Sequence, residues 1–249
     1  MKRHIYHNWA SYLFYGFLSV IVVFAISQGV SQYKNQHYLQ QLASDVISQA
    51  KATDQLSAVI AMRDYVWQHV SRAHYPARGR PYLRDSAADI IRSGKGRCGE
   101  ATRAFIGLAA TRGIQAQRLY LEGQRRHVVA LVKLDSGERL IVDSSESPYI
   151  QNVESLDRLS QHSEFDYYSS FNRPRMIVSL PRNAVSLGPL GYYLENPHAL
   201  KSAFSFLLGA GCLSLRLLPR RLLRRRKMRT KGNDVRENSW QTAEAAPIL

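Results

Sequence analysis

A cysteine and a histidine stand at the starts of two predicted elements in the middle of the chain. Cys98 follows the glycine-rich run SGKGR and opens an apolar-periodic segment, which predicts a thiol in the first turn of a helix. The thiolate is the reactive form of cysteine, and a helix N-terminus beside cationic groups favours it. Lys95 and Arg97 are the cationic neighbours. Cys98 is therefore a candidate nucleophile; the alternative is a small buried residue at a helix–loop junction.

A thiol nucleophile needs a general base, and the base needs a group that orients it. His127 opens a predicted strand, and Asp143 ends the strand that follows it. On its own, a histidine such as His127 at a strand start is usually a surface residue. An aspartate such as Asp143 at a strand end is usually a cap. Together with Cys98 they indicate a triad for acyl-group chemistry. A zinc site is the weaker alternative, because one Cys and one His at this spacing lack paired ligands. We expect no metal and no cofactor.

The elements that must position these residues follow from hydrophobic periodicity and turn residues. Helices are predicted over Leu42–Lys51, Thr53–Ser71, Asp85–Arg92 and Cys98–Arg112. Strands are predicted over Ile114–Leu121, His127–Leu134 and Arg139–Asp143. Helices followed by an antiparallel meander predict the α+β class, with the cysteine-bearing helix packed on a sheet. The pattern does not organise residues 150–198.

The hairpin between the last two predicted strands decides whether the histidine and the aspartate meet. Its loop is the sequence Asp-Ser-Gly, which ends at Gly137. A two-residue turn at Ser-Gly would place His127 and Asp143 on opposite faces of the sheet, because successive side chains alternate between faces. A three-residue loop with Gly137 in the left-handed conformation pairs Leu134 with Glu138 instead. Both side chains then share one face, so the triad hypothesis predicts the three-residue loop.

Two apolar runs flank the middle of the chain. Residues 9–27 carry no charge, and their length is close to the roughly 20 residues with which a helix crosses a bilayer. We expect an uncleaved anchor there; a cleaved signal peptide is the alternative. In residues 199–218, Lys201 and Arg216 lie near the ends, where long basic side chains reach the interface. We expect a second span; a buried or interfacial amphipathic helix is the alternative.

The formal net charge of +15 is concentrated at the ends of the chain. Residues 28–200 hold 21 Lys and Arg against 16 Asp and Glu, whereas eight basic residues lie between Arg220 and Lys231. This distribution argues against nucleic-acid binding, which needs a basic stripe on the folded domain. The C-terminal cluster, like Lys2 and Arg3, is typical of the cytoplasmic side of a membrane. Both termini are therefore expected in the cytoplasm. A protein-docking role for the basic tail is an alternative to its role as a topology signal.

The expected organisation has six parts. They are a cytoplasmic N-terminus (1–8), a transmembrane helix (9–27), a linker with a helix (28–53), an extracytoplasmic domain (54–198), a second transmembrane helix (199–218) and a basic, disordered cytoplasmic tail (219–249). The middle domain holds one cysteine, which excludes a disulfide framework within it.

The segments SGKGRCGEATRAFIGLAATRGIQAQRLYL, His127-Val-Val and LIVDSSES resemble the transglutaminase-like superfamily of cysteine enzymes. In that superfamily a Gly-Cys helix start precedes a strand, a His opens the next strand, and an Asp sixteen residues later ends the one after. The separation from His127 to Asp143 is sixteen. The resemblance covers about residues 54–148. It implies a papain-like α+β core with Cys98 as nucleophile, His127 as general base and Asp143 as the residue that orients the imidazole.

The chain departs from the superfamily pattern at the walls of the expected cleft. Val128 and Val129 stand where an aromatic residue is common, and Ser144 stands where a proline often follows the aspartate. These departures concern the residues that face the substrate more than the triad.

Four basic residues are candidates for substrate binding. Arg125 and Arg126 precede His127 directly, and with Lys95 and Arg97 they could form a basic rim around the cleft. An acidic substrate or an anionic envelope surface would suit such a rim. Solvated loops are the alternative interpretation.

Together with the two apolar runs and the basic clusters, the resemblance leads us to expect a bacterial inner-membrane protein with two spans and its catalytic domain on the periplasmic or extracytoplasmic side. The implied activity is that of an acyltransferase, amidase or peptidase that attacks amide or ester bonds of the envelope through a thioester. Peptide or polysaccharide polymers are the implied substrates, and envelope-assembly proteins are possible partners. A non-catalytic member that binds or positions an envelope polymer is the alternative from another functional class.

Overall fold

The protein is described from a computed structural model. The described residues are 2–71, 83–122, 126–145, 153–155 and 189–217. The chain divides into two compact units, one of residues 1–25 and 203–249 and the other of residues 26–202. The predicted triad lies within the second unit.

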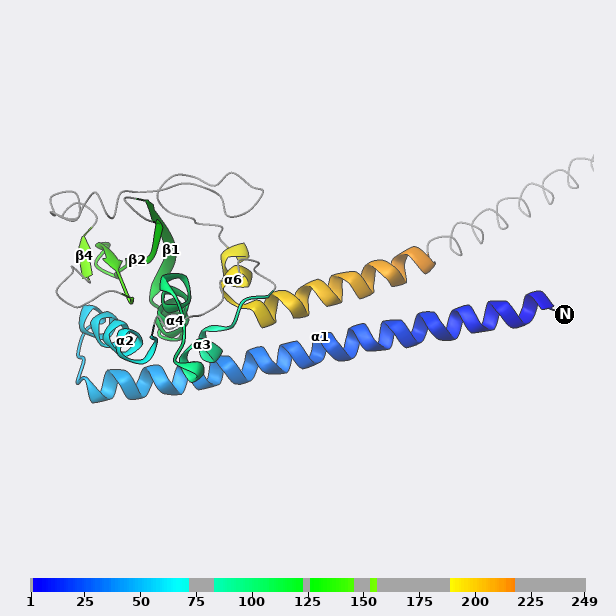
Figure 1. The fold of residues 1–249 in the computed structure, drawn as a ribbon, viewed down its shortest axis with the longest axis horizontal. Helices are drawn as coiled ribbons and strands as arrows, with labels where there is room; N and C mark the ends of the chain where they lie inside the picture. The colour runs from blue at the N-terminus through cyan, green and yellow to red at the C-terminus, as the bar shows by residue number, and fades with distance from the viewer. Residues whose placement is uncertain (1, 72–82, 123–125, 146–152, 156–188, 218–249) are drawn as a thin grey trace, which may run out of the picture. The chain divides into compact units, whose positions relative to one another are not determined.

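Along the chain, helices both precede and follow a small sheet (Figure 1). The helices are α1 (Lys2–Gln49), α2 (Gln55–His69), α3 (Ala87–Ser93), α4 (Cys98–Thr111), α6 (Pro189–Glu195) and the helix Pro197–Leu217. The strands are β1 (Gln115–Glu122), β2 (Arg126–Lys133), β3 (Arg139–Val142) and β4 (Val153–Ser155), which pair antiparallel in the order β1-β2-β3-β4. The predicted α+β class is confirmed.

Local side-chain signals set the starts and ends of the helices near the site. A capping box starts α2. The Asp54 carboxylate accepts a hydrogen bond from the Ser57 amide, and the Asp54 amide donates one to the Ser57 hydroxyl. Ser86 caps α3 in the same way through the Asp89 amide. The chain leaves α3 at Gly94 in the left-handed conformation, with φ of 63°. This turn aims the chain toward the start of α4.

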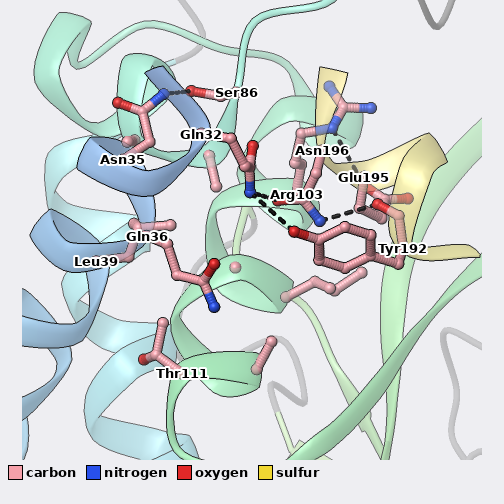
Figure 2. A pocket seen from close by; sticks show the side chains of 15 residues that line it. Gln32, Asn35, Gln36, Leu39, Ser86, Arg103, Thr111, Tyr192, Glu195 and Asn196 are labelled. Atoms are coloured by element: carbon pink, nitrogen blue, oxygen red, sulfur yellow. Dashed lines mark hydrogen bonds and ion pairs between the residues drawn. The ribbon is translucent and has the colours of Figure 1, made fainter. Parts of the chain in front are cut away.

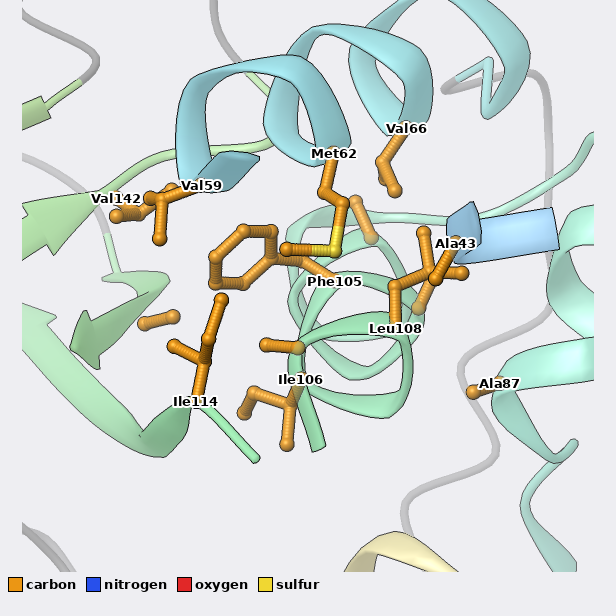
Figure 3. Close-up of a cluster of buried hydrophobic side chains, with 14 of the residues drawn as sticks. Ala43, Val59, Met62, Val66, Ala87, Phe105, Ile106, Leu108, Ile114 and Val142 are labelled. Atoms are coloured by element: carbon orange, nitrogen blue, oxygen red, sulfur yellow. The ribbon is translucent and has the colours of Figure 1, made fainter. Parts of the chain in front are cut away.

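Helix α4 is the centre of the hydrophobic core. It packs against β1 and β2 on one side and against α2 and α3 on the other (Figure 1). Phe105 and Leu108 of α4 lie with Met62 and Val66 of α2 in one buried cluster, shown in Figure 3. Residues 101–106, 108 and 109 of α4 are all buried. A helix enclosed on all sides gives its first turn, and Cys98, a fixed place.

A glycine allows the close approach of α3 to α4. A Cβ atom at Gly107 would lie 2.5 Å from the Cβ of Ala87 and 3.3 Å from a methyl group of Leu39. No side chain fits at that separation, so the glycine is required where α1, α3 and α4 meet.

The polar stretch 28–41, which the sequence pattern leaves as a linker, is helical and belongs to α1. Its buried residues Asn35 and Leu39 show why. Leu39 packs in the core, and Asn35 donates to Ser86 at 2.9 Å. Tertiary contacts therefore stabilise a helix that the composition of this segment does not predict.

Two helices are long and apolar enough to cross a membrane, by length and composition. They are Ser11–Gln49, a part of α1, and Pro197–Leu217. In the unit of residues 1–25 and 203–249, many large apolar side chains of these helices are exposed, among them Leu13, Val20, Val23, Leu207 and Leu215.

Candidate active site

His127 and Asp143 form a buried pair. The imidazole Nε2 lies 2.6 Å from the carboxylate Oδ2, and the two side chains are only 3% and 1% exposed. Because an ionised carboxylate only accepts hydrogen bonds, the proton of this bond belongs to Nε2. The ring therefore keeps Nδ1 for a second partner.

The hairpin loop brings this pair together, as the triad hypothesis predicts. Strands β2 and β3 pair Ala130 with Val142, and the Leu134 amide donates to the Glu138 carbonyl at 2.9 Å. This is the three-residue loop, with Gly137 at φ of 88°. The predicted register is confirmed, and His127 and Asp143 share a face of the sheet.

Cys98 is the first residue of α4, and its thiol is half-buried. The thiol hydrogen-bonds the His127 side chain. Since Nε2 bonds Asp143, Nδ1 is the ring nitrogen left for the sulfur. The order of contacts is thus thiol, imidazole, carboxylate, as in a nucleophile with a base and an orienting acid.

The electrostatics of the three groups favour a thiolate–imidazolium pair. Burial alone would lower the pKa of His127, but the hydrogen bonds with Asp143 and Cys98 outweigh burial and raise this pKa to about 9. Interaction with the Cys98 charge contributes to the rise. The coupling is mutual, so the protonated imidazole stabilises the thiolate.

Asp143 stays ionised because its surroundings favour the charge. Burial would raise the pKa of Asp143, but the His127 hydrogen bond and the Ser145 contacts together lower it. Ser145 donates to Oδ1 twice, from its amide at 2.9 Å and from its hydroxyl at 3.0 Å. The carboxylate therefore has one oxygen held by Ser145 and the other left for the imidazole.

Two further side chains tie the triad to the core, and the sequence analysis missed both. Arg63 of α2 is 1% exposed, and its Nε donates to the Asp143 main-chain carbonyl at 2.7 Å. The Thr102 hydroxyl lies 2.8 Å from the Cys98 carbonyl and 2.9 Å from the Val128 carbonyl. Thr102 thus joins the helix that carries Cys98 to the strand that carries His127. A signal for Arg63 existed, since it stands on the apolar face of α2 where a charge is costly unless it has partners.

The structure describes the four residues of the predicted basic rim only in part. Lys95 and Arg97 are exposed. The backbone of Lys95 pairs with that of Ser71 in an isolated parallel β-bridge, and the Arg97 amide donates to the Glu100 carboxylate at 3.1 Å. Arg125 lies outside the described residues, and only the backbone of Arg126 is described. Their substrate-binding role stays a prediction.

Among the described residues, no three or more His, Cys, Asp or Glu side chains gather as they would around a metal ion.

No protein-family model matches the chain, and no curated protein matches it. Among solved structures, it is similar to a candidate cysteine protease from Cytophaga hutchinsonii, with 19% identity, a TM-score of 0.39, and coverage of 49% of this chain and 41% of that one. A candidate protease from Parabacteroides distasonis has 13% identity, a TM-score of 0.35, and coverage of 51% and 30%. A TGase has 17% identity, a TM-score of 0.36, and coverage of 47% and 32%. The chain thus spans less than half the length of each, over a region of about half its own length.

Proposed function

We propose that the protein is a membrane-anchored cysteine enzyme that acts on amide or ester bonds through a thioester. The observation that carries this proposal is the buried His127–Asp143 bond of 2.6 Å, made by a histidine that also contacts the Cys98 thiol. A structural cysteine does not need an imidazole held in this way, whereas a nucleophile does.

The residues have defined roles in this mechanism. The Cys98 thiolate attacks the carbonyl carbon, and a sulfur–carbon bond forms. Protonated His127 gives its proton to the leaving amine or alcohol as the bond to that group breaks, which leaves a thioester. Water or an amine then attacks the thioester while His127 accepts its proton, and the thiolate is released. Asp143 keeps the imidazole in its orientation and balances its charge.

The experiment that tests the activity traps the thioester on the full-length protein. The protein is incubated with cell-envelope extract, acid-quenched and digested, and the Cys98 peptide is weighed by mass spectrometry. We expect an acyl adduct on the native protein and none on the Cys98→Ser or His127→Ala variants, because attack needs the thiolate. The adduct mass would identify the substrate as peptide or polysaccharide. The absence of an adduct, with a Cys98 thiol no more reactive than a free one, would favour the alternative of a binding or assembly factor.

We further propose that the two apolar helices form a membrane hairpin, with residues 54–198 on the extracytoplasmic side. Contacts within the unit of residues 1–25 and 203–249 support it. Arg216 donates to Ser11 at 2.7 Å, and Gly209 lies against Leu18 and Ile21. Contacts that run in opposite directions along the two helices describe an antiparallel pair, in which both outer ends share one side. The basic clusters assign that side to the cytoplasm.

Reporter fusions test this topology. A periplasm-active phosphatase fused after residue 150 should be active, and the same enzyme fused after Lys231 should be inactive. A cytoplasm-active reporter at the two positions is the control and should give the reverse pattern. Equal signals at both positions would exclude the hairpin.

A further inference from the structure

A buried charge network joins α6 to the helix that carries the nucleophile. Glu195 is the last residue of α6 and receives both arms of the Arg118 guanidinium, Nε on Oε1 and Nη2 on Oε2, each at 2.7 Å. Arg103 of α4 donates to the same carboxylate at 3.1 Å. Both arginines are buried. Burial would raise the pKa of Glu195, but the two arginines outweigh it and hold this pKa at about 2. The carboxylate is therefore charged at any physiological pH.

The network reaches the main chain next to the nucleophile. The third donor of Arg118, Nη1, bonds the Gly99 carbonyl at 2.9 Å. A Cβ atom at Gly99 would lie 3.5 Å from the same nitrogen, so the guanidinium lies against the backbone there. Gly99 follows Cys98 in the first turn of α4. Since Arg118 is a planar fork, its two bonds to Glu195 set where its third donor points.

Helix α6 has other contacts that do not involve Arg118. The Gln32 amide of α1 donates to the Asn196 side chain at 3.0 Å and to the Tyr192 hydroxyl at 3.3 Å. Figure 2 shows these bonds, together with the Arg103–Glu195 pair, around a cavity of about 70 Å³. A substitution at Gln32 can therefore weaken the contact between α1 and α6 without a change to the hydrogen bond from Arg118 to the Gly99 carbonyl.

We propose that Glu195, acting through Arg118, is a positioning residue for Cys98. It holds the first turn of α4 at the place where the thiol meets His127. Thr102 links the same turn to β2, through the Cys98 and Val128 carbonyls. The inference rests on the proposed function of Cys98 as nucleophile. It adds that the segment just before the helix Pro197–Leu217 completes the active site.

A purely structural role for the network makes a different prediction. In that case, loss of Glu195 would lower stability as loss of Gln32 does, and the Cys98 thiol of the folded protein would stay as reactive as before. A positioning role changes the thiol itself, because the thiolate depends on its contact with the imidazole.

The test measures alkylation of Cys98 by iodoacetamide against pH in the full-length protein in detergent. Cys212→Ser is present throughout so that one thiol reports. We expect Glu195→Gln to slow alkylation at pH 7 by about threefold to tenfold and to move the midpoint of the pH profile toward about 8.5, the value of a free thiol. Gln32→Ala should keep both the native rate and the native midpoint. Glu195→Asp, which keeps the charge, should restore most of the rate.

Each outcome decides a separate question. A folded Glu195→Gln protein with native rate and midpoint would overturn the positioning role and leave the proposed function intact. A native protein whose Cys98 reacts like a free thiol, unchanged by His127→Ala, would overturn the proposed function itself. If Glu195→Gln does not fold, Arg118→Lys replaces it, because an ammonium group cannot span Glu195 and Gly99 as the guanidinium does. A native profile in Arg118→Lys would overturn the inference.

Discussion

Replacement of Asp143 by Asn is expected to lower acyl-adduct formation on Cys98 by about 10⁴-fold, the effect of replacing an orienting carboxylate by its amide. The Asp143 Oδ2 accepts the Nε2 proton at 2.6 Å inside the core. An amide has no charge to balance the imidazolium, and its NH₂ group would favour the other tautomer. Alkylation of Cys98 at pH 7 should fall by about tenfold. That loss is smaller because a free thiol still ionises to a few per cent at this pH.

The raised pKa of His127 determines how both the stability of the fold and the alkylation of Cys98 depend on pH. The pKa of His127 is about 9 in the folded protein and 6.5 in the reference state. Protonation of His127 therefore stabilises the fold fully below about pH 6.5 and ceases to do so as the pH rises through about 9. The ratio of native to Asp143→Asn alkylation rates should increase as the pH falls below about 8.5, the value of a free thiol, and should approach one above pH 9, where the thiol ionises without help.

Asp135→Asn is the matched control, because Asp135 is an exposed carboxylate on the same hairpin. Its main-chain amide bonds Gln55, and its side chain lies outside the triad. The control should behave as the native protein does at every pH. An Asp143→Asn protein with native adduct formation would remove Asp143 from the mechanism.

The hairpin shows how much of the site follows from local rules. Apolar residues run through β2 and β3 without alternation, so Val129, Leu131 and Ile141 are buried as well as Ala130, Val132, Leu140 and Val142. Burial alone therefore permits either register. The three-residue loop, with Gly137 as its left-handed residue, could be predicted only with the added condition that His127 and Asp143 share a face.

The parts that could not be predicted depend on pairs far apart in the chain. Arg118 and Glu195 are 77 residues apart, and Arg63 lies 80 residues before the Asp143 carbonyl that it bonds. Nothing in local periodicity selects one buried arginine's partner among many carboxylates and carbonyls. A buried charge signals that a partner exists, but only the packing of α2, α4 and α6 identifies it.

The continuity of α1 is a second example. Residues 28–41 are too polar for a membrane span and too weakly amphipathic for a core helix, so composition favoured a linker. The helix is held by single contacts such as Asn35 with Ser86, on the first turn of α3. Such contacts are decided by the neighbour, and one segment's sequence does not contain them.

Replacement of Phe105 by Ala is expected to remove about 3–5 kcal/mol of unfolding free energy, the range for a large aromatic side chain deleted from a core. Phe105 is fully buried and lies in one cluster with Val59 and Met62 of α2 and with Ile114 (Figure 3). A helix enclosed on all sides has little freedom to close the resulting cavity. The measurement is urea unfolding followed by the fluorescence of Trp67 on α2, with Trp9 and Trp240 replaced by Phe in every variant. The control is Ile60→Ala, because Ile60 lies on α2 and is 39% exposed. This replacement should lower the unfolding free energy by less than about 1 kcal/mol.

The outcome bears on the site as well as on the core. Phe105 lies seven residues after Cys98 on α4, about two helical turns away. The α2 residues that pack on it flank Arg63, which bonds the Asp143 carbonyl. If Phe105→Ala cost no more than the control, α2 would not be packed on α4, and Arg63 would have no fixed place from which to hold Asp143. A large loss would instead tie the stability of the α2–α4 contact to the geometry of the triad.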